Sequence, residues 1–261
     1  MFIGAVVLFL CLIMQIISML IFSTEYPDSL FQSIILFLTS IPFSILIYGY
    51  VGLVIKNILN NNNSLPSWKN LKSIILMGFK INAILLFVLL AIFMFYFLKS
   101  YSIFDALGDI LYILWIFYYP MSCYNITIAL MSIMYVIFCP SIYSLALILV
   151  IPIALLLILN FISNGIKNIL NLGTVKKFLC LEYFKVLFVI FIYFLISNLM
   201  YVIYAYITIT DFNLSFALQR YFIFSDLSLE SLILIFIRKF IQFYFLVVIG
   251  KTLGNYAKKH K

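Results

Sequence analysis

The residues of this chain that could do chemistry are few, and they are scattered. The only histidine, His260, lies next to the last residue, and no two of the four cysteines have C-x-x-C spacing. Three of the cysteines lie in apolar runs, where a cysteine behaves as a small buried hydrophobic residue. The sequence also contains no carboxylate dyad and no glycine-rich phosphate loop. We therefore expect no His-based triad, no metal site, no cofactor and no enzymatic activity.

The most unusual charged residues are Arg238 and Lys239, which interrupt an otherwise apolar run. A charge at the middle of a bilayer costs about 2.5–3.5 kcal/mol even on the milder scale, so such a pair marks a candidate functional site. If the pair is buried, Glu230 and Glu182 are the expected counter-ions. The alternative is that residues 212–237 follow the membrane surface and that both cations snorkel to water.

The composition excludes a water-soluble protein. Hydrophobic residues make up 67% of the 261 residues and charged residues 9%, whereas a soluble domain has about 25% charged residues. A soluble domain of roughly 250–300 residues buries only about three quarters of its unfolded surface, too little to hide this much apolar area. A soluble enzyme, a secreted module and a disordered chain are therefore excluded. The net charge of +8 comes from basic residues at the ends of apolar runs, which indicates a membrane and not a nucleic acid as the partner.

Apolar runs of about 20 residues, the length that crosses a bilayer, predict an all-α fold. We expect one integral membrane domain, 1–261, built as a polytopic transmembrane helix bundle. A further apolar segment at 110–138 is expected to be re-entrant or interfacial. Residues 1–22 have no charged n-region, so we expect them to remain as a helix and not to be removed as a signal peptide. The six expected spans lie at 1–22, 30–55, 73–98, 141–163, 186–209 and 229–250.

The chain contains the hexapeptide Ile-Lys-Asn-Ile-Leu-Asn twice, at 55–60 and at 166–171. An Ile-Pro pair precedes each copy by twelve or thirteen residues, and a basic segment that ends in Phe-Lys follows each copy. These shared surroundings predict an internal repeat of 30–98 and 141–209. Repeats of this kind are frequent in transporters, and membrane proteins without transport activity contain them too.

The positions of the lysines predict which side of the membrane each copy faces. If 110–138 does not cross the membrane, one side holds twelve lysines and the other holds Lys99 and Arg220. A full crossing would divide the cations nine against five. The positive-inside rule favours the first arrangement, with both copies and both termini cytoplasmic. The twelve residues are Lys56, Lys69, Lys72, Lys80, Lys167, Lys176, Lys177, Lys185, Lys251, Lys258, Lys259 and Lys261.

The segment that begins with the first copy has the composition of an elbow in the headgroup layer. We call residues 55–80 the first elbow and the corresponding residues 166–185 the second elbow. A polar turn, a proline at the start of a helix and a tryptophan flanked by lysines are typical of a membrane interface. We expect a structural role, with a site for a lipid headgroup or a partner as the alternative. The residues assigned to the first elbow are Lys56, Pro66, Trp68, Lys69, Lys72 and Lys80.

Several motifs around the first elbow carry a family resemblance. They are IYGYVGLVIK at 47–56, SLPSW at 64–68 and GFK at 78–80, together with FY at 243–244 and LGNY at 253–256. The chain resembles the largely archaeal family of multi-pass membrane proteins called domain of unknown function 4013. The resemblance implies a multi-pass membrane fold, and it implies no known activity or ligand.

Two classes of function remain after these exclusions. The first is a non-enzymatic membrane subunit or scaffold in the cell membrane, packed against lipid and against a membrane-protein partner or a second copy of the chain. The alternative is a transporter or permease-like module for a small solute, which the repeat, the prolines and the two cations within an apolar run favour. Substitution of Arg238 or Lys239 would separate the two classes.

Overall fold

The computed structural model describes residues 1–23, 29–97, 142–208 and 229–260, and it is all-helical over these residues. The expected all-α class is therefore confirmed for this part of the chain. The predicted segment 110–138 lies outside the described residues. The helices are α1 (Phe2–Ser23), α2 (Ser29–Leu59), α3 (Leu71–Phe97), α6 (Ile142–Asn164), α7 (Leu172–Phe178), α8 (Leu181–Thr208) and α10 (Leu229–His260), with a short 3-10 turn η1 (Ile166–Asn168) before α7.

Two stretches of the described chain are long and apolar enough to cross a membrane. They are Leu38–Leu59 in α2 and Leu71–Val88 in α3. They fall within the spans expected at 30–55 and 73–98, apart from a few residues at their ends. Two such helices are compatible with a membrane location by length and composition, and the expected total of six spans stays a prediction.

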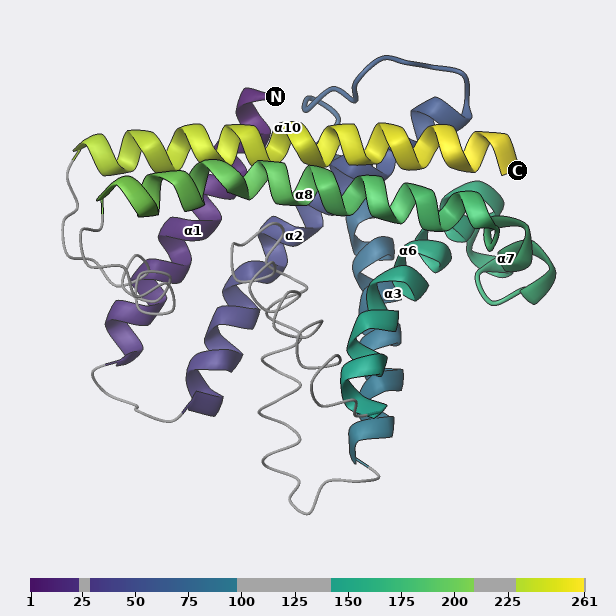
Figure 1. The fold of residues 1–261 in the computed structure, drawn as a ribbon, viewed down its shortest axis with the longest axis horizontal. Helices are drawn as coiled ribbons and strands as arrows, with labels where there is room; N and C mark the ends of the chain where they lie inside the picture. Colours follow the sequence, from purple (N-terminus) through teal and green to yellow (C-terminus); the bar gives the residue numbers. More distant parts are fainter. Residues whose placement is uncertain (24–28, 98–141, 209–228, 261) are drawn as a thin grey trace.

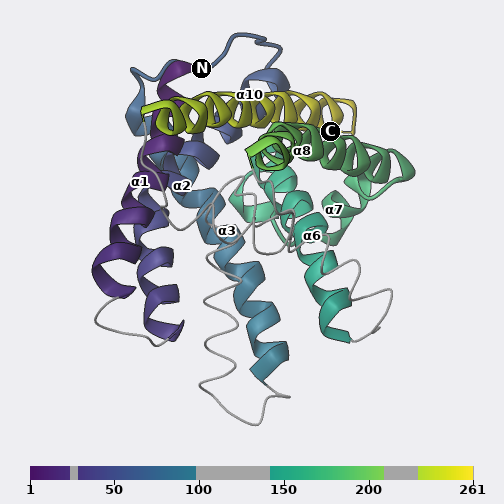
Figure 2. The same cartoon turned by 60° about the vertical axis from the view of Figure 1, so that its left-hand side comes forward.

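The helices form two groups that meet at one end of the molecule. Helices α1, α2, α3 and α6 extend away from that end, whereas α8 and α10 lie side by side across it at a steep angle (Figures 1 and 2). The spans expected at 186–209 and 229–250 fall in α8 and α10. These two segments therefore do not run alongside the other four helices, as a simple six-helix bundle would require.

Helices α2 and α3 approach each other very closely, because both carry glycine at their contact. A Cβ atom added at Gly49 would lie 2.0 Å from the backbone oxygen of Ile74, and one added at Gly78 would lie 1.9 Å from that of Ile45. Small residues that let helix backbones touch are a common way of packing helices in membranes. The polar pair Ser44 and Asn82 adds a buried hydrogen bond of 3.1 Å between the same two helices.

The buried core joins α10 to the helices beneath it. Tyr50 and Val54 on α2 pack in one cluster with Phe243, Val247 and Leu253 on α10. A second cluster holds α3 against α6 and is formed by Met77, Ile81, Ile84, Leu85, Val88, Ala154, Leu157, Ile158 and Phe161. Because α10 also contacts α8, it connects both groups of helices.

Candidate functional site: a polar cluster where the second elbow meets the end of α10

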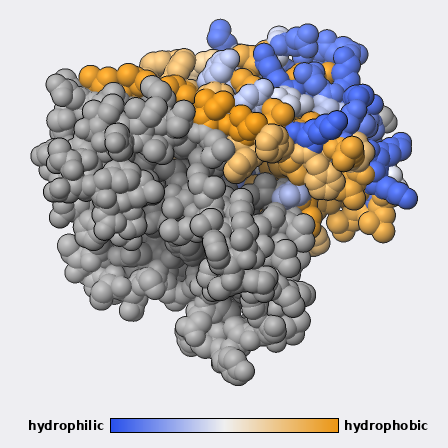
Figure 3. All heavy atoms as spheres, viewed as in Figure 1, coloured by the Kyte–Doolittle hydropathy of each residue, from blue (hydrophilic) through white to orange (hydrophobic). Residues whose placement is uncertain are grey.

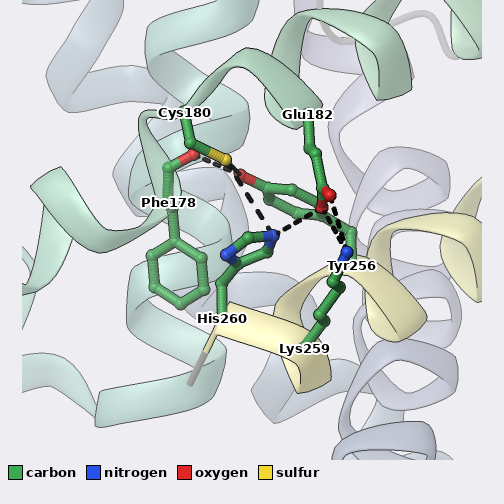
Figure 4. Close-up of polar contacts among 6 residues, drawn as sticks. All are labelled: Phe178, Cys180, Glu182, Tyr256, Lys259 and His260. Atoms are coloured by element: carbon green, nitrogen blue, oxygen red, sulfur yellow. Dashed lines mark hydrogen bonds and ion pairs between the residues drawn. The ribbon is translucent and has the colours of Figure 1, made fainter.

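The polar cluster that joins the second elbow to α10 is centred on Glu182. Lys259 Nζ lies 2.6 Å from Glu182 Oε1 and 2.9 Å from Oε2, and His260 Nε2 lies 3.0 Å from Oε2. Figure 4 shows the side chains of Lys259 and His260 reaching from the last turn of α10 toward the carboxylate. We call this group, with Cys180 and Tyr256, the α8–α10 latch.

Local sequence places each partner of the latch at a helix end that suits its charge. The backbone N–H of Tyr183 donates to the carbonyl of Cys180 at 2.9 Å, so Cys180 occupies the N-cap position of α8. Glu182 then lies in the first turn of α8, and Lys259 and His260 lie in the last turn of α10. An acid near a helix N-terminus and bases near a C-terminus both interact favourably with the helix dipole.

The hydrogen bonds from Lys259 and His260, the first being the larger effect, hold the pKa of Glu182 below its usual value. The carboxylate therefore stays ionised at neutral pH. Its side chain is 45% exposed, and exposed ion pairs contribute little to stability because water screens them. The latch thus sets how α8 and α10 align more than how strongly they bind.

Tyr256 on α10 makes a second, more buried polar contact with the second elbow. Its hydroxyl donates to the backbone carbonyl of Phe178, whose ring is fully buried, and lies 3.4 Å from the Cys180 Sγ. A phenol has one proton, so the carbonyl bond leaves its oxygen to accept from the thiol. Burial raises the pKa of Tyr256. Tyr183 donates to the carbonyl of Pro152 at 2.6 Å, which joins α8 to α6.

The position of His260 decides what this cluster can do chemically. One nitrogen, Nε2, faces both Glu182 Oε2 at 3.0 Å and Cys180 Sγ at 3.9 Å. In a catalytic triad the acid holds one ring nitrogen while the other takes the proton of the nucleophile, so the acid and the nucleophile must face opposite nitrogens. This geometry suits an electrostatic clamp between two helices and not a proton relay.

Glu182 does not serve the role that its sequence position suggested. It was a proposed counter-ion for Arg238 and Lys239, but it pairs with Lys259 and His260. Lys239 precedes Lys259 by 20 residues, which is about 30 Å along a helix. The carboxylate of Glu182 cannot bridge that length, so this part of the prediction is wrong.

Lys239 itself is buried, with 2% of its surface exposed. Its ammonium group lies close enough to the Cys11 thiol of α1 to interact with it electrostatically. The side chain therefore does not extend freely into water, as the snorkelling alternative would require. Arg238 and Glu230 lie on α10, and their side chains are outside the described part of the structure.

The first elbow turns its aromatic residue inward. The Trp68 ring stacks on the Tyr50 ring at 4.6 Å between centroids, with Phe243 at 6.1 Å. Its indole nitrogen is buried and has no hydrogen-bond partner among the described residues. Trp68 thus connects the elbow to the core, and Pro66 is half-buried beside it in the sequence. The lysines of this elbow, Lys56, Lys69, Lys72 and Lys80, are all exposed.

Sequence reasoning missed the latch, although one signal was present. Seven of the eight acidic residues lie in or beside the predicted outer connections, and Glu182 alone lies on the predicted lysine-rich side. A lone acid among bases on one side of a membrane is expected to find a cationic partner there. The partner was not predictable, because Glu182 and Lys259 are 77 residues apart in the chain.

Comparisons with known proteins give this chain no relative. No family model, no curated protein and no solved structure matches it. The resemblance to the family called domain of unknown function 4013 therefore stays a prediction, based on the motifs alone.

Proposed function

We propose that this chain is a non-enzymatic, multi-pass membrane subunit or scaffold, packed against lipid or against a membrane-protein partner. The observation that carries the proposal is the large set of apolar side chains on the outside of the helices. Leu76, Phe79 and Phe87 on α3 and Phe184 and Phe188 on α8 are each more than half exposed. Soluble monomers rarely expose contiguous apolar surface on this scale, whereas lipid tails accept it.

The distribution of polarity supports the same proposal. Hydrophilic residues gather at the end of the molecule where the first elbow, α7 and the end of α10 lie (Figure 3). In a membrane, such a cap faces water and headgroups, and the apolar helices below it face hydrocarbon. The polar groups of the latch hold helices together and leave no acid and base arranged for proton transfer.

The direction of the chain supports a cytoplasmic position for both elbows in this proposal. Helices α1, α2, α3 and α6 run alternately away from and toward the capped end, so both elbows and the N-terminus lie near it (Figure 1). Helix α10 contacts the first elbow through Phe243 and the second through Tyr256. In this proposal these four helices cross the bilayer, and Leu38–Leu59 in α2 and Leu71–Val88 in α3 are long and apolar enough to do so.

The topology is tested by labelling single cysteines introduced at Lys72 and Lys176, in a chain whose four native cysteines are replaced by serine. A membrane-impermeant maleimide is applied to intact cells and to inverted vesicles. The proposal expects both positions to react only in inverted vesicles. Labelling from opposite sides would overturn the topology, and release of the protein by alkaline carbonate would overturn the integral membrane assignment.

The scaffold role itself is tested by native mass measurement of the protein taken directly from its membrane. The proposal expects a defined assembly with a partner or with a second copy, and no solute whose flux depends on the chain. A monomer in a membrane whose solute flux follows the amount of this protein would contradict it.

The burial of Lys239 specifically favours a second candidate, a transporter or permease-like module. A cation enclosed between helices is expensive and is often kept for binding a substrate or a coupling ion. This candidate expects Lys239→Ala, or Arg238→Ala, to abolish uptake or efflux of a solute while expression and folding stay normal. Unchanged flux in both variants would exclude it.

A further inference from the structure

The second elbow presents its aliphatic side chains outward. Leu172 is 82% exposed and Leu181 is 74% exposed, and Ile166, Leu170 and Leu179 are each more than half exposed. Exposed apolar residues occur on many helices of this chain, but these five lie in one short segment among polar residues, from η1 through α7 to the first residue of α8. A short segment with this many exposed aliphatic residues is unusual for a surface that faces water.

Lysines lie between these aliphatic residues. The only acid of the second elbow is Glu182, which is already engaged by Lys259 and His260 of α10. The positive charge of the elbow is therefore not neutralised within the described structure. The exposed lysines of the second elbow are Lys167, Lys176, Lys177 and Lys185.

We propose that the second elbow is a docking surface for anionic phospholipid, with its lysines on the headgroup phosphates and its exposed leucines among the upper acyl chains. The inference rests on the proposed membrane function and names the lipid class that this site binds. Interleaved cations and aliphatic groups are the composition that places a segment at an anionic bilayer surface. A nucleic acid or an acidic protein would satisfy the lysines and leave the leucines in water.

The elbow is held in shape before any lipid arrives. Asn160 Nδ2 on α6 donates to the carbonyls of Asn168 and Ile169, at 2.5 and 3.0 Å. Asn171 caps α7 by accepting from the backbone N–H of Gly173 at 3.0 Å. A surface that is already ordered loses less conformational entropy when a ligand binds, so its affinity is higher.

The first test measures lipid retention by native mass spectrometry. The purified full chain is equilibrated with equal amounts of phosphatidylglycerol and phosphatidylcholine in detergent. The wild type is expected to keep phosphatidylglycerol in preference. Each lysine near an anionic surface contributes about fivefold in affinity, so removing two of them in K176Q/K177Q is expected to reduce this preference by about 25-fold. The control K251Q/K258Q removes the same charge from α10 and is expected to change it less than threefold.

The second test asks whether the leucines enter the bilayer. Leu172→Trp is reconstituted in vesicles that contain brominated phosphatidylglycerol or brominated phosphatidylcholine, and the fluorescence of a chain without this substitution is subtracted. Strong quenching, greater with the brominated anionic lipid, is expected. Leu65→Trp in the first elbow is the matched control and is expected to be quenched less.

Each outcome of the two tests supports or overturns a specific statement. Equal retention of both lipids by the wild type, or equal loss in both double variants, overturns the lipid site. A dimer that forms through the elbow and excludes lipid also overturns it. If the chain resists alkaline carbonate extraction in all these cases, the proposed membrane function stands and only the lipid site is lost.

Discussion

The two elbows begin with the same six residues and fold them differently. In the first elbow, Ile55 and Ile58 are buried in the last turns of α2, where the backbone of Gly254 on α10 lies against them. In the second elbow, the equivalent of Ile55 is Ile166, which is exposed in the 3-10 turn. The first isoleucine of the repeat is therefore core in one copy and surface in the other, whereas Ile169, the equivalent of Ile58, is only partly buried against the second cluster.

The difference arises from the residue that precedes each copy and from the neighbouring helix. Val54 continues α2 into the first copy, whereas Gly165 precedes the second copy with a φ of 82° and ends α6. A positive φ is inexpensive only for glycine. Tertiary contacts then decide the rest, because a helix turn persists where a partner buries its apolar face. A sequence repeat thus predicts equivalent positions in the chain and not equivalent surroundings.

The largest difference between the two elbows is expected when one methyl group is added at a glycine in each, as Gly78→Ala or Gly173→Ala. Gly78→Ala would place a Cβ atom 1.9 Å from the Ile45 carbonyl oxygen, so α2 and α3 must separate. We expect a loss of about 2–3 kcal/mol in the free energy of unfolding in detergent. Gly173→Ala in α7 meets only Asn171 Oδ1 at 3.3 Å and is expected to change stability by less than about 1 kcal/mol. Similar losses for both would show that the second elbow is packed as tightly as the first.

The next largest difference in stability is expected when one large apolar side chain in each elbow is truncated to alanine. Trp68→Ala removes the stack on Tyr50 and is expected to cost about 2 kcal/mol, less than for a fully buried tryptophan. Leu172→Ala removes a side chain that is 82% exposed and is expected to change stability by less than about 0.5 kcal/mol in detergent. Thermal unfolding of both variants measures the difference. A large loss for Leu172→Ala would mean that another surface covers it.

Gly165 allows the effect of backbone conformation to be tested separately from the effect of packing. A Cβ atom at this position meets nothing within 4 Å, so Gly165→Ala introduces conformational strain and no clash. Gly165 has a φ of 82° and a ψ of 172°, a conformation that is essentially restricted to glycine and costs other residues about 1–3 kcal/mol, so we expect a loss of at least about 1 kcal/mol in the free energy of unfolding. Gly173→Ala, where φ is helical, is the matched control. An unchanged stability would show that the turn can open without cost, so that glycine is not what separates the two copies.

The sequence predicted the helices well because apolar runs determine where helices form in such a chain. The expected span 141–163 corresponds to α6, Ile142–Asn164, and the span 1–22 corresponds to α1, Phe2–Ser23. The prediction ended the last helix at Gly250, whereas α10 continues to His260. The bilayer-length rule placed that end, but Leu253 and Tyr256 pack in the core beyond it and keep the chain helical.

The directions of the helices were not predictable in the same way. A helix that is apolar all round has no polar stripe to show which face is buried, and α8 is such a helix. The α8–α10 latch could not be predicted for a related reason. Glu182, Cys180 and Tyr256 form no motif in the sequence, and only the packing of α8 against α10 brings them together. Trp68 is a different case. The sequence placed it in an elbow of the headgroup layer, but in the structure its ring packs inward onto Tyr50.

The smallest effect is expected for the exposed ion pair between Glu182 and the last turn of α10. Because Lys259 and His260 lower the pKa of Glu182, the latch contributes its full stability above the ordinary glutamate pKa of about 4.5. That contribution is lost as the pH falls through the lowered value. Glu182→Gln should therefore lower the unfolding temperature slightly at pH 7, and the difference from wild type should shrink as the pH falls below about 4.5 and through the lowered pKa of the carboxyl group. The control Lys258→Gln removes a charge from the same turn of α10 and should show no such pH-dependent difference. If Glu182→Gln and wild type differ equally at neutral and at acidic pH, the side chain of Glu182 acts through packing, and its charge does not help to hold the second elbow to α10.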